Sequence, residues 1–270
     1  MSPQLEDGWL DVLGKARRGL GLSEEALAQA SGLPLDQLRS ILAGQSDPSC
    51  APALASALGL QASALRQLME NAPRPFPSTP QDLTIFSTPF DDMLVNSYLL
   101  CDYKNSSAIA FDTGADAGPM LDHIKAHQLT LKLILLTHTH GDHILDLDRL
   151  MEKTRATAWV HEREALPGAE PFRSGHLFEL DSWQIETRLT WGHSRGGCTY
   201  VVRGASQALA VVGDALFASS MGGGRESYPD ALATNQKEIF SLPDETLLCP
   251  GHGPLSTVGL EKIHNPFYRP

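Results

Sequence analysis

The chain has 270 residues, of which 42% are hydrophobic and 20% are charged, as expected of a globular protein with one large domain or a large and a small one. Its net charge of −11 argues against a surface that coats nucleic acid, and the lack of eighteen consecutive apolar residues argues against a transmembrane helix and a membrane partner. The N-terminus lacks the basic and apolar segments of a secretory signal, and the four scattered cysteines form no C-x-x-C pair, so we expect a cytoplasmic protein without a disulfide framework.

Residues 1–70 are predicted to form a small all-α domain. Apolar residues recur at helical spacing, Ser23 can cap one helix, and Pro34 suits the first turn of another helix that ends at Gly44. The expected helices span residues 9–20, 24–30, 34–43, 53–58 and 63–69. Their order is two helices, a tight turn, a third helix, and two supporting helices.

This order resembles the helix-turn-helix domain of the Cro/C1 repressor type. The resemblance is carried by Leu22-Ser23-Glu24-Glu25-Ala26-Leu27-Ala28, Ser31-Gly32-Leu33-Pro34, Ile41-Leu42-Ala43-Gly44, Pro48 and residues 54–60. In such domains the helix after the turn enters the major groove of DNA. The resemblance therefore implies DNA as a partner, contacted by Gln37, Arg39 and Ser40.

The charge of the helical domain favours a different role. Residues 1–70 hold five basic and eight acidic side chains, a net charge of −3, whereas phosphate neutralisation supplies much of the affinity for DNA. Asp36 would also stand close to the phosphate backbone. The alternative is a helical module that covers the rest of the protein or joins two copies into a homodimer.

A Pro-rich segment follows the helices and marks the expected domain boundary. Four prolines (Pro73, Pro75, Pro77 and Pro80) fall within eight residues, which excludes a helix and favours an extended, semi-rigid connector. We therefore predict three parts, which are a helical domain at 1–70, a linker at 71–82 and a second domain at 83–270.

The second domain is predicted to be α+β. Strands are expected at 83–87, 93–101, 107–111, 131–136, 157–161, 177–180, 183–189, 199–203, 208–212 and 246–249, and helices at 118–128, 144–154 and 231–240. Two groups of strands with interspersed helices suit a two-sheet, layered αββα sandwich. The whole chain is thus expected to be an αββα sandwich preceded by a small all-α domain.

One turn of the second domain is dense in side chains that bind metals. It reads Thr137-His138-Thr139-His140-Gly141-Asp142-His143 and follows the apolar run 131–136, a predicted buried strand. In extended backbone His138 and His140 are two residues apart, so they can project to the same side. Imidazoles with a carboxylate suit zinc, iron or manganese better than calcium or magnesium. We therefore expect a metal site where this strand ends.

The same turn resembles the H-x-H-x-D-H signature of the metallo-β-lactamase-fold hydrolases. Four further segments match that family in its own order: Asp112-Thr113-Gly114, Trp191-Gly192-His193-Ser194-Arg195-Gly196-Gly197, Val212-Gly213-Asp214-Ala215-Leu216-Phe217 and Pro250-Gly251-His252-Gly253. The matches extend over about residues 83–255. The resemblance implies two more histidine ligands, an aspartate that bridges two metals, and Asp112 as a residue that supports the ligands.

The complete set suits two divalent metal ions, zinc first, with iron or manganese as alternatives. The expected ligands are His138, His140 and His193 for one metal, Asp142, His143 and His252 for the other, and Asp214 as the bridge. A carboxylate can bridge because its two oxygens carry separate lone pairs. Two such metals share a water and lower its pKa, so hydroxide can attack without a Ser or Cys nucleophile. We assign catalytic roles to Asp142 and Asp214.

The residue at position 214 distinguishes members of this family. The β-lactamases of zinc subclasses B1 and B2 commonly carry Cys there, so Asp214 argues against a B1-type lactamase. Flavodiiron oxygen reductases usually carry Glu where this chain has His140. The resemblance is greatest to glyoxalase II (hydroxyacylglutathione hydrolase), which hydrolyses thioesters. We therefore expect a metal-dependent thioesterase that acts on a small-molecule substrate.

The substrate itself is not fixed by the sequence. Only eighteen residues follow His252, so we expect the C-terminal helical domain that holds glutathione in long glyoxalase II to be missing, and glutathione as the thiol stays open. The loop 219–225 could reach a substrate, and Arg225 could hold a carboxylate or phosphate. Arg195 is a second candidate. Each arginine is equally well explained as a solvated surface charge.

Three alternatives to a thioesterase stay open. A persulfide (sulfur) dioxygenase would use one iron held by His138, His193 and Asp214. A lactone or phosphodiester hydrolase would use the two-metal site on a different bond. A protein of another class would be a DNA-binding regulator in which the metal domain senses a metabolite for the helix-turn-helix.

Overall fold

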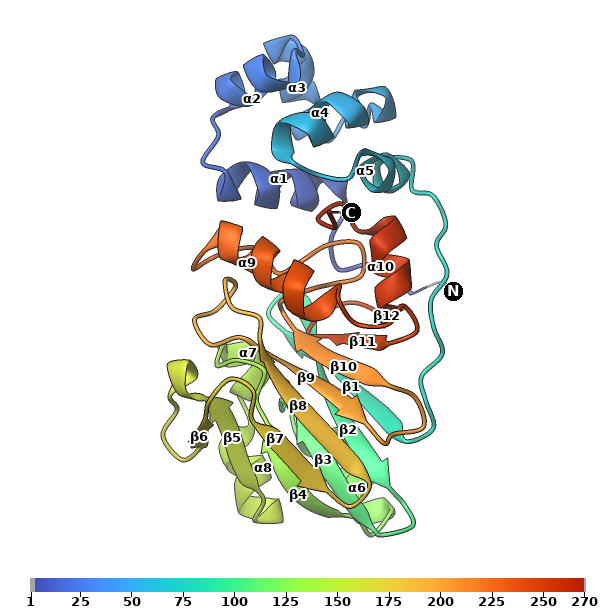
Figure 1. Cartoon of the computed structure of the whole chain (residues 1–270), viewed down its shortest axis with the longest axis vertical. Helices are drawn as coiled ribbons and strands as arrows, with labels where there is room; N and C mark the ends of the chain where they lie inside the picture. The colour runs from blue at the N-terminus through green and yellow to red at the C-terminus, as the bar shows by residue number, and fades with distance from the viewer. Residues whose placement is uncertain (1–2, 270) are drawn as a thin grey trace.

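The computed structural model describes residues 3–269 and places a group of five helices on one end of a two-sheet sandwich (Figure 1). These helices are α1 (Trp9–Gly19), α2 (Glu24–Ser31), α3 (Leu35–Leu42), α4 (Ala51–Leu58) and α5 (Ala62–Met69). The Ser23 hydroxyl accepts a hydrogen bond from the backbone N–H of Ala26 and so caps α2. Gly32 (φ 70°) ends α2 and Gly59 (φ 66°) ends α4, both in the left-handed conformation that glycine adopts at helix ends.

The first sheet of the sandwich contains strands β1 to β6 in chain order. They are β1 (Leu83–Phe90), β2 (Met93–Asp102), β3 (Ser107–Phe111), β4 (Thr130–Leu135), β5 (Thr157–His161) and β6 (Glu170–Phe172). The pairs β1–β2 and β2–β3 are antiparallel, and β3 to β6 are parallel. Parallel strands need crossover connections, which here contain α6 (Gly118–Ala126), α7 (Gly141–Ile144) and α8 (Leu147–Thr154).

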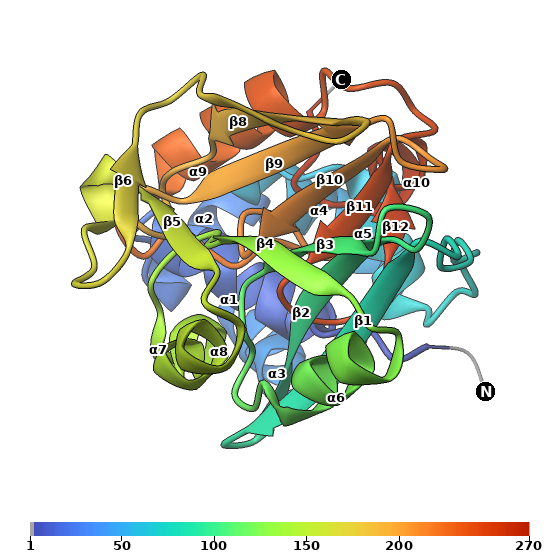
Figure 2. The same ribbon diagram turned by 90° about the horizontal axis from the view of Figure 1, so that it is seen from below.

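The second sheet has the order β12-β11-β10-β9-β8-β7. Its strands are β7 (Leu177–Leu180), β8 (Trp183–Leu189), β9 (Cys198–Arg203), β10 (Leu209–Gly213), β11 (Leu247–Pro250) and β12 (Ser256–Thr257). Helix α9 (Tyr228–Thr234), a π turn at Asn235–Ile239 and helix α10 (Val258–His264) lie beyond this sheet. Figure 2 shows the first sheet with α6 and α8 on one side and the second sheet with α9 and α10 on the other.

Three apolar clusters hold these layers together. One fills the space between the sheets and includes the fully buried Phe111 and Tyr200. A second packs α6 and α8 on the outer face of the first sheet. The third joins the outer face of the second sheet, α9 and α10 to the N-terminal helices, from Val12 and Leu13 to Tyr228. The expected two-sheet sandwich with helices on both faces is therefore confirmed, and the N-terminal helices share a core with it.

The structure differs from the expected elements in several places. The helix expected at 144–154 is two helices, because the ligand turn itself becomes helical at α7 and the chain bends before α8. The helix expected at 231–240 starts at Tyr228 and passes into the π turn. The short strands β6 and β12 and helix α10 were not expected. Thr257 caps α10 by accepting from the backbone N–H of Leu260, a start signal that the sequence does contain.

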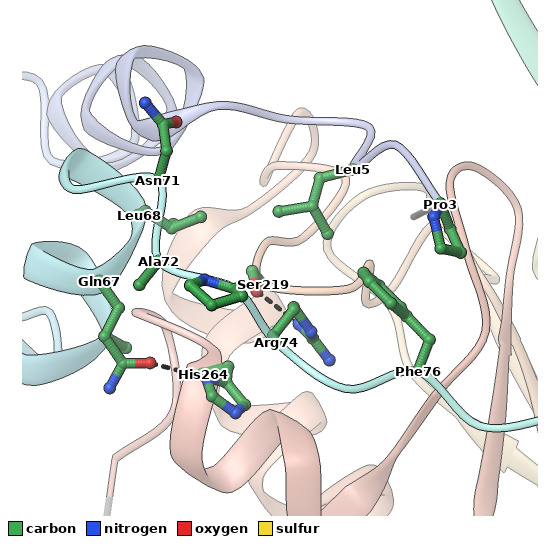
Figure 3. A pocket seen from close by; sticks show the side chains of 12 residues that line it. Pro3, Leu5, Gln67, Leu68, Asn71, Ala72, Arg74, Phe76, Ser219 and His264 are labelled. Carbon is green, nitrogen blue, oxygen red and sulfur yellow. Dashed lines mark hydrogen bonds between the residues drawn. The ribbon is translucent and has the colours of Figure 1, made fainter. Parts of the chain in front are cut away.

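The segment 71–82 runs extended along the outside of the molecule from α5 to β1 (Figure 1). Arg74 anchors it, because its buried guanidinium donates to Glu261 (2.7 Å), to Ser256 (2.7 Å) and to the Ser219 hydroxyl (Figure 3). The side chain of Glu261 is completely buried and also accepts from the backbone N–H of Ser219 and the amide of Asn265. The linker is therefore attached to α10 and to the loop after β10.

Further contacts fix the N-terminal helices on α9 and α10. Gln61 donates from its backbone N–H to the carbonyl of Pro266 (2.7 Å), and His264 lies 2.7 Å from the side-chain oxygen of Gln67 (Figure 3). A side chain at Gly19 would meet the ring of Tyr228, since an added Cβ would lie 2.2 Å from its Cγ. Within residues 3–269, no helix is long and apolar enough to cross a membrane.

The Arg74 anchor predicts a large loss of stability on truncation. Arg74→Met should lower the free energy of unfolding by about 3–5 kcal/mol, because it leaves the buried Glu261 carboxylate without its cation. Urea denaturation followed by circular dichroism measures this loss. Arg66→Met, which removes an exposed arginine on α5, is the matched control and should unfold like the wild type. A loss below about 1 kcal/mol for Arg74→Met would contradict the anchor.

Candidate metal centre

Seven side chains of the sequence motifs meet where strands of both sheets end. His138 and His140 follow β4, and Asp142 and His143 lie in α7. The other three come from the second sheet, with His193 after β8, Asp214 after β10 and His252 after β11. Their ligand atoms form two groups in which all atoms lie within 4.8 Å of one another, one of His138, His140, His193 and Asp214, the other of Asp142, His143 and His252.

The first group presents three imidazole nitrogens and one carboxylate oxygen. His140 Nδ1 lies 2.9 Å from His138 Nε2 and 3.0 Å from His193 Nε2. His193 Nε2 lies 3.3 Å from Asp214 Oδ2. Two nitrogens bound tetrahedrally to one zinc ion are about 3.3 Å apart, given zinc–nitrogen bonds of about 2.0–2.1 Å. These separations therefore suit a single metal ion.

The second group has a carboxylate and two imidazoles. His252 Nε2 lies 3.2 Å and His143 Nε2 lies 3.6 Å from Asp142 Oδ2. Asp214 lies between the groups, with Oδ1 3.3 Å from His143 Nε2 and Oδ2 3.6 Å from His252 Nε2. The two oxygens of Asp214 can therefore serve different metal ions.

Two buried atoms show that a cation fits between these groups. Among residues 3–269, His143 Nε2 and Asp214 Oδ1 find no hydrogen-bond partner although both are buried. Burying such polar atoms without partners is costly, and a bound cation would satisfy both. The backbone at Gly251 packs closely against this carboxylate, because a Cβ added there would lie 2.2 Å from Asp214 Oδ1. The donor set and the space thus fit metal ions.

Hydrogen bonds on the far side of three of the imidazole rings fix the orientation of their ligand nitrogens. His143 Nδ1 donates to Asp112 (2.8 Å), which also accepts from the backbone and the hydroxyl of Thr137. His193 Nδ1 donates to the carbonyl of Gly222 (2.8 Å), and His252 Nδ1 donates to the carbonyl of Leu94 (2.7 Å). Each of these three rings is therefore held with Nε2 facing the centre, the orientation that metal-binding histidines adopt.

Burial and charge act differently on the members of the set. Burial holds the pKa of His138 well below 6.5, so its imidazole is neutral. Burial would raise the pKa of Asp214, but the surrounding imidazoles, His143 first, hold it well below its usual range. Burial would lower the pKa of His252, but hydrogen bonds to Asp142 and Asp214 raise it to about 10. Without a cation, protons on histidines thus balance the two carboxylates.

Glu164 is a supporting residue that the sequence did not reveal. Its carboxylate accepts from the hydroxyl of Thr139 (2.6 Å) and from the backbone N–H of Gly196 (2.7 Å). It thereby ties the turn that carries His138 and His140 to the loop that carries His193. No motif marks Glu164, because it lies 25 and 32 residues from its two partners along the chain.

The two arginines proposed for substrate binding differ in their surroundings. Arg225 is exposed and follows Gly222, whose carbonyl accepts from His193 Nδ1, by three residues, so it lies near the first ligand group. Its positive charge contributes, after burial, to the lowered pKa of His140 and His193. Arg195 pairs with Glu226 (3.1 Å) and is 76% exposed. In the loop between Asp214 and Arg225, Ser219, Ser220 and Met221 are buried, so these three residues do not face a substrate, contrary to the expectation for the loop 219–225.

A groove of about 650 Å³ lies beside His252. It is bounded by Leu94, whose carbonyl accepts from His252, and by Gly253. Its charged lining residues, among those that the structure describes, are the carboxylates Glu6, Asp91 and Asp92. The site thus has an acidic groove near the second ligand group and Arg225 near the first.

The residues expected to contact DNA lie on the exposed face of α3. Gln37 donates to the carboxylate of Asp47 (3.2 Å), and Ser40 is exposed. Arg39 forms ion pairs with Glu24 (3.0 Å) and Glu25 (3.1 Å), so two carboxylates already offset its charge. Within residues 3–269, the side chains of Gln37, Arg39 and Ser40 form no hydrogen bond with a metal-ligand residue.

Comparison with known sequences shows where the chain has relatives. The profile of the Metallo-beta-lactamase superfamily matches residues 90–252, so the match starts after the N-terminal helices. The probable metallo-hydrolase YqgX of Bacillus subtilis is 32% identical over 205 residues, which are 66% of this chain and 94% of that protein. The hydroxyacylglutathione hydrolase GloC of Haemophilus influenzae is 26% identical over 197 residues, 64% of this chain and 92% of that enzyme.

Solved structures with the same fold include a β-lactamase and ETHE1. The crystal structure of BLEG-1, a B3 metallo-beta-lactamase, superposes with a TM-score of 0.62 at 28% identity and covers 68% of this chain and 99% of that one. ETHE1 from Myxococcus xanthus gives a TM-score of 0.60 at 25% identity and covers 68% of this chain and 83% of its own. With a profile match over more than half of its length and a relative matched almost end to end, this protein belongs to the metallo-beta-lactamase superfamily.

Proposed function

We propose that this protein is a hydrolase that uses two divalent metal ions, zinc first, to cleave a thioester. The observation that carries the proposal is the Asp214 carboxylate, whose two oxygens lie 3.3 Å from ligand nitrogens of different groups. A mononuclear centre does not need a carboxylate between two groups of ligands. Asp rather than Cys at position 214 also argues against a B1-type lactamase.

The proposed roles of the side chains follow from their burial. Two metal ions held by these seven side chains would supply a hydroxide at neutral pH and positive charge for the developing oxyanion. Asp214 keeps the two groups of ligands together. Asp142 is the carboxylate that reaches the surface, with 13% of its side chain exposed, and we assign it the proton that the attacking water releases. Water and thioester are thereby converted into a carboxylate and a free thiol.

One relative supports a thioester as the substrate, and the charge of the groove restricts which thiol the substrate can carry. The hydroxyacylglutathione hydrolase GloC is similar over nearly its whole length. Glu6, Asp91 and Asp92 would repel the carboxylates of glutathione on one side of the site, whereas Arg225 could bind a carboxylate on the other. We therefore propose an acyl thioester with a carboxylate near Arg225, and glutathione is one thiol among those to be tested.

The second candidate function is a mononuclear-iron persulfide dioxygenase. It is favoured by the similarity to the ETHE1 structure and by His138, His193 and Asp214, which could hold one iron. Lactam, lactone and phosphodiester hydrolysis use the same two-metal chemistry on other bonds. DNA binding is not part of the proposal, because Arg39 is paired with Glu24 and Glu25 and the helical domain carries a net negative charge.

Removing the bridging carboxylate should abolish the centre. In Asp214→Ala, metal content by mass spectrometry should fall below that of the wild type, and kcat/KM for a chromogenic thioester should fall by about 100-fold or more, since even outer partners of ligands contribute 10–100-fold. Asp148→Asn, an exposed acid on α8, is the control and should keep both. Full metal content and activity in Asp214→Ala would overturn the dinuclear assignment.

The metal count separates the two candidate reactions. Protein purified without added metal should contain about two metal ions per chain and hydrolyse thioesters without consuming oxygen. An oxygen electrode with a glutathione persulfide provides the second measurement. About one iron per chain, with oxygen uptake and without thioester turnover, would replace the hydrolase by the dioxygenase. β-Lactam, lactone and phosphodiester substrates in parallel test the remaining hydrolase activities.

Arg225 and Arg195 provide a matched pair for substrate binding. Arg225→Met should raise KM about 10-fold for a thioester that carries a carboxylate, with little change for its neutral amide analogue, because only the former loses an ion pair. Arg195→Met removes an arginine that already pairs with Glu226 and should change neither KM. Equal KM changes for both substrates would show that Arg225 does not recognise the carboxylate.

A further inference from the structure

The loop that follows Asp214 connects the ligands to the N-terminal helices. We refer to residues 217–222 as the ligand-side loop. At its far end the backbone N–H of Gly222 donates to the carbonyl of Asp214 (3.0 Å), and the carbonyl of Gly222 accepts from His193 Nδ1 (2.8 Å). A shift of this loop would therefore move the hydrogen-bond acceptor that orients His193.

Lys15 of α1 binds the ligand-side loop directly. Its ammonium donates to the carbonyl of Met221 (2.8 Å), the residue before Gly222, and forms an ion pair with Asp7. Asp7 in turn accepts from the hydroxyl of Ser220 (2.5 Å). Both charged side chains are mostly buried, with 16% of Lys15 and 10% of Asp7 exposed. Two consecutive loop residues are thus bound by one ion pair of the N-terminal domain.

The same ammonium also approaches the second ligand group. Lys15 Nζ lies 5.1 Å from the centre of the Phe217 ring, within the range of a cation–π contact. The Phe217 ring packs edge-to-face on His252, with ring centres 5.5 Å apart and an angle of 79°. One lysine outside the superfamily match therefore stands behind a histidine of each group.

Other contacts hold the loop but do not duplicate those of Lys15. Arg74 and Glu261 bind Ser219, and Asn265 donates to the carbonyl of Ser220 (2.8 Å). Figure 3 shows Arg74 reaching Ser219 from the linker side, with Leu5 of the N-terminal segment nearby. These partners hold Ser219 and Ser220. Within residues 3–269, Lys15 is the one side chain that donates to the carbonyl of Met221.

We propose that Lys15, together with Asp7, is a positioning residue for the metal centre. It holds the carbonyl of Met221 and the ring of Phe217 so that His193 and His252 keep their orientation. Through Lys15 and Asp7, the N-terminal part of the chain thus helps to position the metal ligands. The inference rests on the proposed metal-dependent function of the same ligands, and outer partners of metal-binding histidines typically contribute 10–100-fold to metal affinity.

The test compares three variants of the full-length protein. Lys15→Met removes the ammonium while keeping an unbranched side chain, Lys15→Arg keeps a cation and donors, and Arg18→Met removes an exposed cation from the same helix. The dissociation constant for zinc is measured by competition with a chromogenic chelator, and kcat and KM are measured with the thioester. Circular dichroism of the metal-free proteins establishes that each variant is folded.

Lys15→Met should weaken zinc binding about 10-fold or more and lower kcat with KM nearly unchanged, because the ligands and not the substrate contacts are disturbed. Lys15→Arg should recover most of the affinity, and Arg18→Met should bind zinc like the wild type. If Lys15→Met does not fold, Asp7→Asn, which keeps the shape of the side chain, should show the same weakening of zinc binding.

The outcomes separate this inference from the proposed function. Wild-type zinc affinity in folded Lys15→Met or Asp7→Asn, or weak binding in Lys15→Arg equal to that of Lys15→Met, would overturn the positioning role alone. Weakened zinc binding in the absence of any thioester turnover would retain the positioning role and remove the thioesterase. A wild-type protein that binds neither zinc nor iron would overturn both.

Discussion

The centre of this protein depends on a carboxylate buried among imidazoles. Asp214 is 8% exposed, and its charge is stable there only because cations surround it, either protonated histidines or bound metal. The strands that end at this point come from both sheets, so the same electrostatic requirement links the two halves of the sandwich. Gly251 and Gly222 approach Asp214 closely, and a Cβ would collide with its carboxylate at Gly251 and with its backbone carbonyl at Gly222.

The N-terminal helices are also joined to the sandwich by buried contacts. They share one apolar cluster with α9 and α10, and they send a buried ion pair, Lys15 with Asp7, to the loop behind the ligands. A domain that binds DNA independently would be expected to keep its own closed core and a basic outer face. Here the outer helix α3 carries Arg39 in ion pairs with two glutamates, and the inner helices α1 and α5 are committed to the sandwich.

The sequence predicts local features of the fold and site well and distant contacts poorly. Strands such as β3, β5 and β8 agree to the residue. The first is a short, mostly apolar run before Asp112-Thr113-Gly114, and β8 alternates outward polar with inward side chains after Asp181-Ser182. Four of the seven side chains that the structure brings together could be selected from their type and close spacing in the turn 137–143, whereas His193, Asp214 and His252 were expected from the resemblance of their segments to the family's motifs. Lys15 could not, since it lies 206 residues from the Met221 carbonyl that it binds, and an isolated lysine has no distinguishing pattern.

The Pro-rich segment 71–82 has a consequence for how the two parts of the chain stay together. Because Arg74 is anchored on α10 and the helices share an apolar core with the sandwich, a protease cut after residue 80 would leave both fragments bound to each other. Conversely, a gene that begins at β1 would produce a sandwich with the apolar surface around Tyr228 open to solvent, a surface prone to aggregation. The covalent connection is thus less important than the buried surface that it accompanies.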